Sequence, residues 1–268
     1  MAEWDADTYQ RISAPQVEWG LAVLDGVSLR GDERAVDAGC GTGRVTRLLA
    51  GRLPRGSVLG VDASENMVAE ASTRLADLAP RVRVERQDLL ELAVPEPVDL
   101  IFSTATLHWI LDHERLFARL FAALAPGGRL VVQCGGAGNI ASAHAAADQV
   151  AARAPYAEHF PEVVRDVNFA DATITADRLR AAGFDEVRTW LHAVPADVGP
   201  VEDGALYLAS IALRPHIARL PEELRGPFAR EVAEIMLGAD GHVVVDYVRL
   251  EIRAHRPPAQ GGEPADGG

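Results

Sequence analysis

The stretch that decides the fold reads Val36-Asp37-Ala38-Gly39-Cys40-Gly41-Thr42-Gly43, residues 36–43. It joins a short apolar run at 34–39 to a run at 44–53 whose apolar residues recur at helical spacing. Glycines at alternate positions let the backbone turn tightly and let a ligand approach without a Cβ in the way. In open α/β sheets, such a turn lies at the carboxyl end of a strand, where ligands bind. The sequence therefore predicts a strand, a ligand-binding turn and a helix in succession.

The dinucleotide-binding fingerprint is one alternative for this turn. It needs glycines at its first, third and sixth positions. Counting from Gly39, the sixth position is Arg44, so the fingerprint fails. The register that fits is an acid, Asp37, two positions ahead of three alternating glycines. A nicotinamide-dependent oxidoreductase on a related sandwich therefore stays as the weaker alternative.

Strand-like and helix-like runs alternate through the first half of the chain. Strands are predicted at 34–39, 57–62, 82–87, 98–104 and 129–134, and helices at 44–53, 64–77 and 112–125, with 126–128 as a stop and turn. A helix at 175–182 and strands at 186–191 and 243–252 follow. Strands that alternate with helices indicate βαβ units and a mainly parallel sheet. Right-handed crossovers make the predicted fold class α/β, a doubly wound Rossmann-like sandwich.

The pattern predicts a single domain over residues 1–256, with its core at 30–135. Segments at about 136–170 and 203–237 interrupt the later strands and are expected to form helical lid inserts. Residues 257–268 contain too few apolar side chains to order and are expected to be a flexible tail. The sequence leaves open whether the protein is a monomer or a homodimer.

Acidic residues recur at the ends of three successive predicted strands: Asp37, Asp62 and Asp88. A carboxylate after the second strand can accept both hydroxyls of a ribose. A carboxylate after the third can accept a hydrogen bond from an exocyclic amine such as that of adenine. Three negative charges along one crevice repel a pyrophosphate and favour a cation. The predicted ligand is a nucleoside with a positively charged extension.

The amino-acid composition argues against several classes of binding partner. With 26 basic and 39 acidic residues the net charge is −13, which disfavours nucleic acid and anionic membrane surfaces. Cys40 and Cys134 are expected to be buried thiols, and no metal-ligand spacing is present. No apolar run is long enough to span a membrane, and the first residues lack the features of a signal peptide. We therefore expect a cytoplasmic location.

Four segments together resemble a known family. VDAGCGTG, GVDASENM, RQDLL and FSTATLHWILDHERLFARLFAALAPGGRLVV are similar to the successive motifs of class I S-adenosylmethionine-dependent methyltransferases. Within that superfamily, Trp4 and Tyr9 near the N-terminus and the pair His108-Trp109 resemble the trans-aconitate methyltransferase-like branch. The resemblance implies seven strands, the last antiparallel, S-adenosylmethionine as cofactor and methylation of a small-molecule acceptor.

The resemblance also implies roles for single residues. Asp37 and the backbone of Gly39, Gly41 and Gly43 would hold the amino-acid part of the methyl donor, and Asp62 its ribose. Ala63 and Met67 would pack near the adenine, Asp88 and Leu89 would bind it, and Thr104 would contact the methionine moiety. One segment departs from the branch, which usually carries an acidic–Arg–x–Arg-Pro stretch after the N-terminal tyrosine. Here residues 10–19 read QRISAPQVEW, with a single arginine, Arg11.

The acceptor side is less defined. A carboxylate acceptor needs no general base, whereas a neutral hydroxyl or amine is helped by a base near pH 7, usually histidine. His108 is the candidate catalytic residue, with packing or capping as its structural alternative. Tyr9, Trp109 and His144 are candidates for substrate binding. A carboxylate is the leading acceptor, and a catalytically silent donor-binding scaffold is the alternative function.

Overall fold

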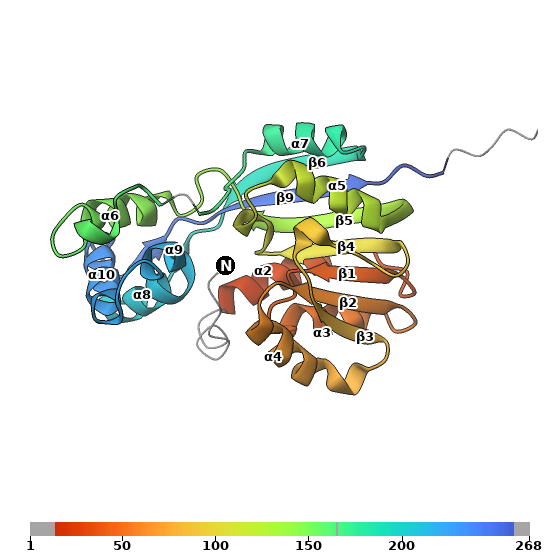
Figure 1. Cartoon of the computed structure of the whole chain (residues 1–268), viewed down its shortest axis with the longest axis horizontal. Coiled ribbons are helices and arrows are strands. Elements are labelled where there is room, and N and C mark those ends of the chain that lie inside the picture. Colours follow the sequence, from red (N-terminus) through yellow and green to blue (C-terminus); the bar gives the residue numbers. More distant parts are fainter. Residues whose placement is uncertain (1–13, 165, 260–268) are drawn as a thin grey trace, which may run out of the picture.

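The computed structural model describes residues 14–164 and 166–259. Seven strands form one sheet in the order β3-β2-β1-β4-β5-β9-β6, stacked from bottom to top in Figure 1. Their bounds are β1 Arg34–Ala38, β2 Ser57–Asp62, β3 Val82–Arg86, β4 Val98–Thr104, β5 Leu124–Gly135, β6 Asp185–Ala193 and β9 Val248–His255. A separate pair consists of β7 Ala196–Asp197 and β8 Val244–Val245.

Strand direction confirms the predicted fold class. The pairs β1–β2, β1–β4, β2–β3 and β4–β5 are parallel, whereas β9 runs antiparallel to both β5 and β6. Because the order reverses between β1 and β4, the carboxyl ends of these two strands open a crevice. The glycine turn follows β1 at this point, as the sequence predicts.

Three predicted boundaries are wrong. Residues 243–252 do not form one strand, because β8 ends at Val245 and β9 starts at Val248. The strand is interrupted at Asp246, whose carboxylate accepts hydrogen bonds from the Ser142 N–H and hydroxyl. β5 starts at Leu124 rather than 129, and the expected turn at 126–128 shifts its register against β4 instead. The helix expected from 175 starts at Ala172, because the Asp171 carboxylate caps it.

Helices cover both faces of the sheet. Their bounds are α2 Ala14–Asp25, α3 Arg44–Arg52, α4 Glu65–Leu75, α5 His113–Ala123 and α7 Ala172–Ala181. Ile101 on β4 packs in the cluster that holds Leu116 and Leu120 of α5, whereas Leu100 packs with Leu49 of α3. Successive strand residues thus point to opposite cores, which is why these strands read as continuous apolar runs.

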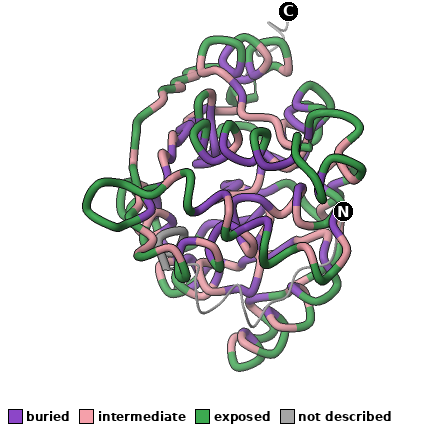
Figure 2. Tube along the Cα trace, turned by 90° about the vertical axis from the view of Figure 1, so that its left-hand side faces the viewer, coloured by how far each residue is buried: buried purple, intermediate pink, exposed green. Residues whose placement is uncertain are grey.

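The remaining helices form a separate group at one end of the sheet, called here the helical layer. It comprises α6 Ala141–Ala151, α8 Val201–Tyr207, the π-helix η5 Leu208–Ala212, α9 Arg214–Ile217 and α10 Glu222–Ile235. These helices lie together on the left in Figure 1 and share one apolar core. Figure 2 looks onto this end, with buried chain inside and exposed chain in the outer loops. Since α6 follows β5 and α8 follows β6, the helical layer lies at the carboxyl ends of these strands.

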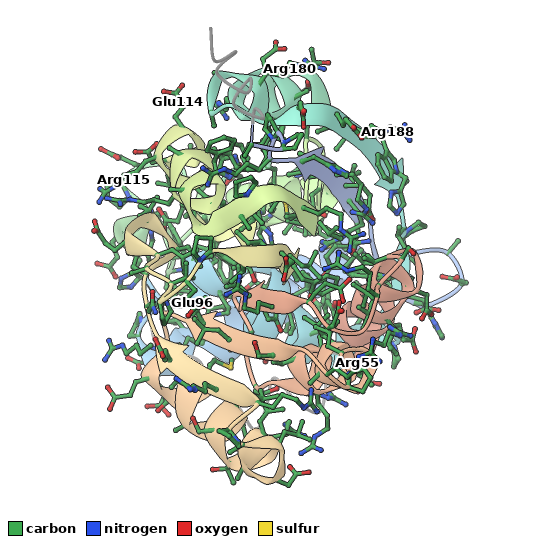
Figure 3. The ribbon with its side chains drawn as sticks, turned by 90° about the vertical axis from the view of Figure 1, so that its right-hand side faces the viewer. Arg55, Glu96, Glu114, Arg115, Arg180 and Arg188 are labelled. Carbon is green, nitrogen blue, oxygen red and sulfur yellow. The ribbon has the colours of Figure 1, made fainter. Side chains whose placement is uncertain are left out.

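The opposite end of the molecule carries charges of both signs. Figure 3 shows Arg55, Glu96, Glu114, Arg115, Arg180 and Arg188 there, pointing outward. Glu96 pairs with Arg34, and Arg115 pairs with Glu91. Among the described residues, no helix is long and apolar enough to cross a membrane.

Candidate active site

A cavity lies at the carboxyl ends of β1 to β4, and we call it the donor cavity. Its lining includes nine residues expected from the sequence: Gly39, Gly41, Asp62, Ala63, Met67, Asp88, Leu89, Thr104 and Trp109. It also includes four that the sequence analysis did not single out: Gln87, Ala105, Thr106 and Ile110. Ala105 and Thr106 directly follow β4 and Ile110 is the C-cap of the short helix after it, so their position after a strand end was the available signal.

The glycine turn needs glycine for two different reasons. Gly39 has a φ of +83°, and a Cβ there would come within 2.1 Å of the Thr106 hydroxyl oxygen. Gly41 has a φ of +53°, but a Cβ there would meet no protein atom within 4 Å. The space beside Gly41 therefore belongs to the cavity and fits a ligand that approaches the backbone. Gly43 does not line the cavity: it precedes α3, and a Cβ there would press on Leu75.

Two carboxylates face the donor cavity. Asp62 Oδ2 accepts a hydrogen bond from the Gly41 N–H at 3.0 Å, and its Oδ1 accepts one from the Ser64 N–H at 2.9 Å. A carboxylate is a hydrogen-bond acceptor at both oxygens, which is the chemistry that a ribose diol requires. Asp88 Oδ1 accepts from the Leu90 N–H at 2.9 Å, at the start of the short helix η2, Leu89–Glu91. The residues present therefore fit a nucleoside held between the ends of β2 and β3.

Asp37 lies behind the glycine turn and outside the cavity lining. It is buried, and the Thr46 hydroxyl donates to its Oδ2 at 2.7 Å. Burial raises the pKa of Asp37 to about 7; the hydrogen bond from Thr46 opposes this rise and the charge of Asp62 adds to it. Asp37 is therefore held behind the glycine turn by Thr46 and does not line the cavity.

A second cavity, called here the acceptor cavity, lies between the sheet and the helical layer. It is lined by Ala105, His108, Trp109, Asn139, Ile140, Val167, Phe169, Ile211, Ala212, Tyr247 and Arg249. Ala105 and Trp109 also line the donor cavity, so the two cavities share a wall. Ala105 holds a φ of 55°, unusual for a residue with a side chain, and its N–H donates to the Gln133 carbonyl at 2.8 Å. This backbone is held under strain where the two cavities meet.

His108 is a buried, neutral imidazole. The Gly135 N–H donates to its Nδ1 at 3.3 Å, so the ring proton is on Nε2. Burial holds the pKa of His108 well below its usual value, with further lowering from the charges of Arg249 and His113. Neither ring nitrogen then has a lone pair free to accept a proton. In this geometry Nε2–H is a hydrogen-bond donor, and the general-base role for which His108 was one candidate has no free lone pair to use.

Arg249 on β9 is the residue that sequence reasoning missed. It is 2% exposed, its Nε donates to Gln133 Oε1 at 3.4 Å, and its guanidinium carbon lies 4.8 Å from the centre of the Trp19 ring. Its Nη2 is buried and has no hydrogen-bond partner within the part of the chain that the structure describes. A buried donor without a partner is costly, which makes this guanidinium a candidate for binding an anionic group.

The other expected acceptor residues are placed differently. His144 on α6 is not among the residues lining either cavity, but its ring stacks on Phe169, with centroids 5.8 Å apart. Phe169 does line the acceptor cavity, so His144 supports its wall from behind. Tyr9 and Trp4 lie outside the described residues.

Comparisons with known proteins show the family to which the chain belongs. Residues 35–128 match the family model described as a methyltransferase domain. The chain is 33% identical to the trans-aconitate 2-methyltransferase of Methylobacterium nodulans, over 96% of this chain and 99% of that protein. It is 34% identical to the protein of the same name from Variovorax paradoxus, again over 96% and 99%.

Solved structures share the fold. One is the phosphoethanolamine N-methyltransferase 2 of Haemonchus contortus in complex with phosphomonomethylethanolamine and S-adenosylhomocysteine, with a TM-score of 0.61 and 19% identity; 94% of this chain matches, spanning 57% of that one. Another is the YcgJ protein of Bacillus subtilis, with a TM-score of 0.60 and 16% identity over 90% of this chain and 98% of that one. The full-length identity to curated relatives decides the assignment: the chain belongs to the class I S-adenosylmethionine-dependent methyltransferases, in the trans-aconitate methyltransferase branch.

Proposed function

We propose that this methyltransferase esterifies a carboxylate of a small organic acid. The observation that carries the proposal is the buried Arg249, whose Nη2 has no partner among the described residues and which lines the cavity beside the donor cavity. The guanidinium fork matches a carboxylate in shape and charge. The names of the curated relatives, which are trans-aconitate methyltransferases, support the same class of acceptor.

On the donor side, we assign binding roles to the residues that the sequence pointed to. Asp62 accepts the ribose hydroxyls, Asp88 and Leu89 hold the adenine with Ala63 and Met67 packed beside it, and Gly39, Gly41 and Thr104 approach the methionine moiety. Gly43 and Asp37 support the turn from behind. The donor supplies an activated methyl group on a cationic sulfur. These residues fix its position and exclude water, which are the main contributions a protein makes to such a displacement.

On the acceptor side, the carboxylate itself is the nucleophile. Its oxygen forms the new O–C bond, the C–S bond breaks with its electron pair going to sulfur, and no proton is released. Arg249 neutralises and orients the acid, and His108 donates from Nε2. Trp109 forms the wall that both ligands share. A bound base is unnecessary for this step, which agrees with the absence of a free lone pair on the His108 ring.

The identity of the acid is open to a direct test. Trans-aconitate is the first acid to test because of the relatives' names. Arg249 is the one arginine in the described acceptor-cavity lining, so acids with one or two carboxylates belong in the same panel. The purified protein is incubated with S-adenosylmethionine and each acid, and the product is examined for a gain of one methylene in mass. S-adenosylhomocysteine formation without an acid gives the background.

Two variants make the test specific. Arg249→Met should lower kcat/KM for the acid at least about tenfold, the worth of a hydrogen bond between charged groups. Arg188→Met, on the exposed surface, is the matched control and should leave it unchanged. Donor binding without turnover of any acid would instead support the catalytically silent scaffold.

A further inference from the structure

Arg249 has an acidic neighbour with which it does not pair. Glu251 lies two residues further along β9, on the same face of the strand, and both side chains are buried. Among the ion pairs of the described residues, none joins Arg249 to Glu251. Buried opposite charges this close in the chain attract each other strongly, so their separation needs a cause.

Gln133 on β5 lies between the two. It is the register partner of Glu251, and its amide bridges both side chains. Its Nε2 donates to Glu251 Oε1 at 2.6 Å, and its Oε1 accepts from Arg249 Nε at 3.4 Å. The second oxygen of Glu251, Oε2, lies 3.1 Å from Arg253 Nη1, as an ion pair without hydrogen-bond geometry. Both carboxylate oxygens of Glu251 are therefore engaged away from Arg249.

Two aromatic rings lie beside the guanidinium of Arg249. The rings of Trp19 and Tyr247 lie 4.8 and 6.0 Å from its guanidinium carbon. The register partner of Arg249 on β5 is Gly135, which presents no side chain to the guanidinium, and its partner on β6 is His192, which carries no carboxylate. Aromatic faces offset part of the cost of burying a cation and leave its hydrogen-bond donors unused.

We propose that Gln133 is a positioning residue that determines specificity for a carboxylate: it keeps Glu251 from pairing with Arg249, so the counter-ion of Arg249 is the acid to be methylated. The proposal deepens the function above and rests on it. An internal Arg249–Glu251 pair would have to break before an acid could bind. A glutamine can bridge the two because it offers a donor and an acceptor on one planar group.

The test is a double-mutant cycle on acceptor binding. In Gln133→Met, which has nearly the same size, Glu251 is free to pair with Arg249, and the KM for the acid should rise about 10- to 100-fold, the worth of one charged hydrogen bond. Glu251→Gln alone should change this KM less than about threefold, because Gln133 already holds the Glu251 carboxylate out of hydrogen-bond contact with Arg249. The double variant Gln133→Met/Glu251→Gln should recover most of the loss, because the competing carboxylate is gone.

Several outcomes would overturn the proposal. An equal loss in Gln133→Met and in the double variant would mean that Gln133 acts only through packing. A tenfold or larger effect of Glu251→Gln alone would contradict it even if Gln133→Met failed to fold. In all variants the dissociation constant of S-adenosylhomocysteine, measured by calorimetry, should stay within about twofold of the parent.

A crystal structure of Gln133→Met separates this proposal from the proposed function. It should show Arg249 within hydrogen-bond distance of Glu251 whether or not a carboxylate is the true acceptor. Persistent separation of the two side chains in that variant would refute the role of Gln133. Failure of every acid to react with the parent protein would instead refute the proposed function.

Discussion

The indole ring of Trp19 lies 4.8 Å from the guanidinium carbon of Arg249 and packs edge-on against Tyr247, with ring centroids 4.9 Å apart. The next residue of α2, Gly20, faces the donor side: a Cβ there would lie 3.0 Å from Val45 of α3 and 3.5 Å from the Thr104 hydroxyl oxygen. One turn of α2 therefore contacts residues of both cavities.

Trp19→Leu should weaken acceptor binding selectively. The substitution keeps an apolar side chain but removes the aromatic face, which contributes about 0.5–2 kcal/mol to holding a buried cation. We expect the KM for the acid to rise about 2- to 30-fold. Steady-state kinetics at saturating donor measure this effect.

The control for this change is Trp19→Phe, which retains an aromatic face and should keep most of the parent's affinity for the acid. The affinity for S-adenosylhomocysteine should change little in either variant. A similar loss of donor and acceptor affinity in Trp19→Leu would mean that the residue holds α2 in place rather than Arg249.

Gly39 and Gly41 should respond differently to the same substitution. Gly39→Ala forces a Cβ onto Thr106 at a φ of +83°, and the strain alone costs about 1–3 kcal/mol. Gly41→Ala has free space, so its cost should be the smaller backbone penalty, yet its methyl group would obstruct the donor. We therefore expect lost stability in the first and lost donor affinity with a near-normal melting temperature in the second.

Thermal unfolding and calorimetry with S-adenosylhomocysteine distinguish the two effects. Gly51→Ala in α3 is a suitable control, since its Cβ would meet no atom within 4 Å and its φ is not left-handed. That variant should bind the donor normally. Full donor affinity in Gly41→Ala would remove the turn from the binding site.

Most residues that line the donor cavity could be predicted from the sequence, because each belongs to a short local motif. Asp62 ends β2, Gly39 and Gly41 follow β1, and Asp88 follows β3. A parallel sheet brings the ends of these neighbouring strands together. The alternating pattern of elements therefore predicted both the sheet and the lining of this cavity. From the sequence we expected Asp37 beside the ligand. Side chains alternate between the two faces of a strand, and that of Asp37 points into the core, where it accepts a hydrogen bond from Thr46.

The residues around Arg249 in the acceptor cavity could not be predicted in this way, because they come from segments far apart in the sequence. Gln133 and Arg249 are 116 positions apart, and each occupies an ordinary strand position. Nothing in the local pattern marks Arg249 as different from Arg253 on the same face. The neutral state of His108 likewise depends on Gly135, whose N–H reaches its ring only because β5 lies beside the segment after β4.

Asp37 should make the stability of the ligand-free protein depend on pH. Its pKa is about 7 in the folded protein and near the ordinary 3.8 when unfolded. A carboxyl group whose pKa is higher in the folded protein than in the unfolded one makes its full contribution to the free energy of unfolding at low pH. That contribution is lost as the pH rises from about 4 to about 7. Asp37→Asn, which can still accept from Thr46, should abolish this decline.

Chemical denaturation at pH 5 and pH 8 measures the effect. The difference in unfolding free energy between the two pH values should be smaller in Asp37→Asn than in the parent by about 1–3 kcal/mol. Thr46→Val should raise the pKa of Asp37 further, because the hydrogen bond that opposes the rise is lost. An identical pH dependence in the parent and in Asp37→Asn would contradict the raised pKa.

Methyl transfer to a carboxylate should release no proton. An anionic oxygen and a cationic sulfur are consumed and a neutral ester and a neutral thioether are formed, so charge balances without a base. Transfer to a neutral hydroxyl or amine would instead release one proton per turnover and would need a base, for which His108 lacks a free lone pair. A pH indicator in weak buffer, followed alongside S-adenosylhomocysteine formation, should show no acidification. Stoichiometric acidification would exclude the carboxylate and require a different group to remove the proton.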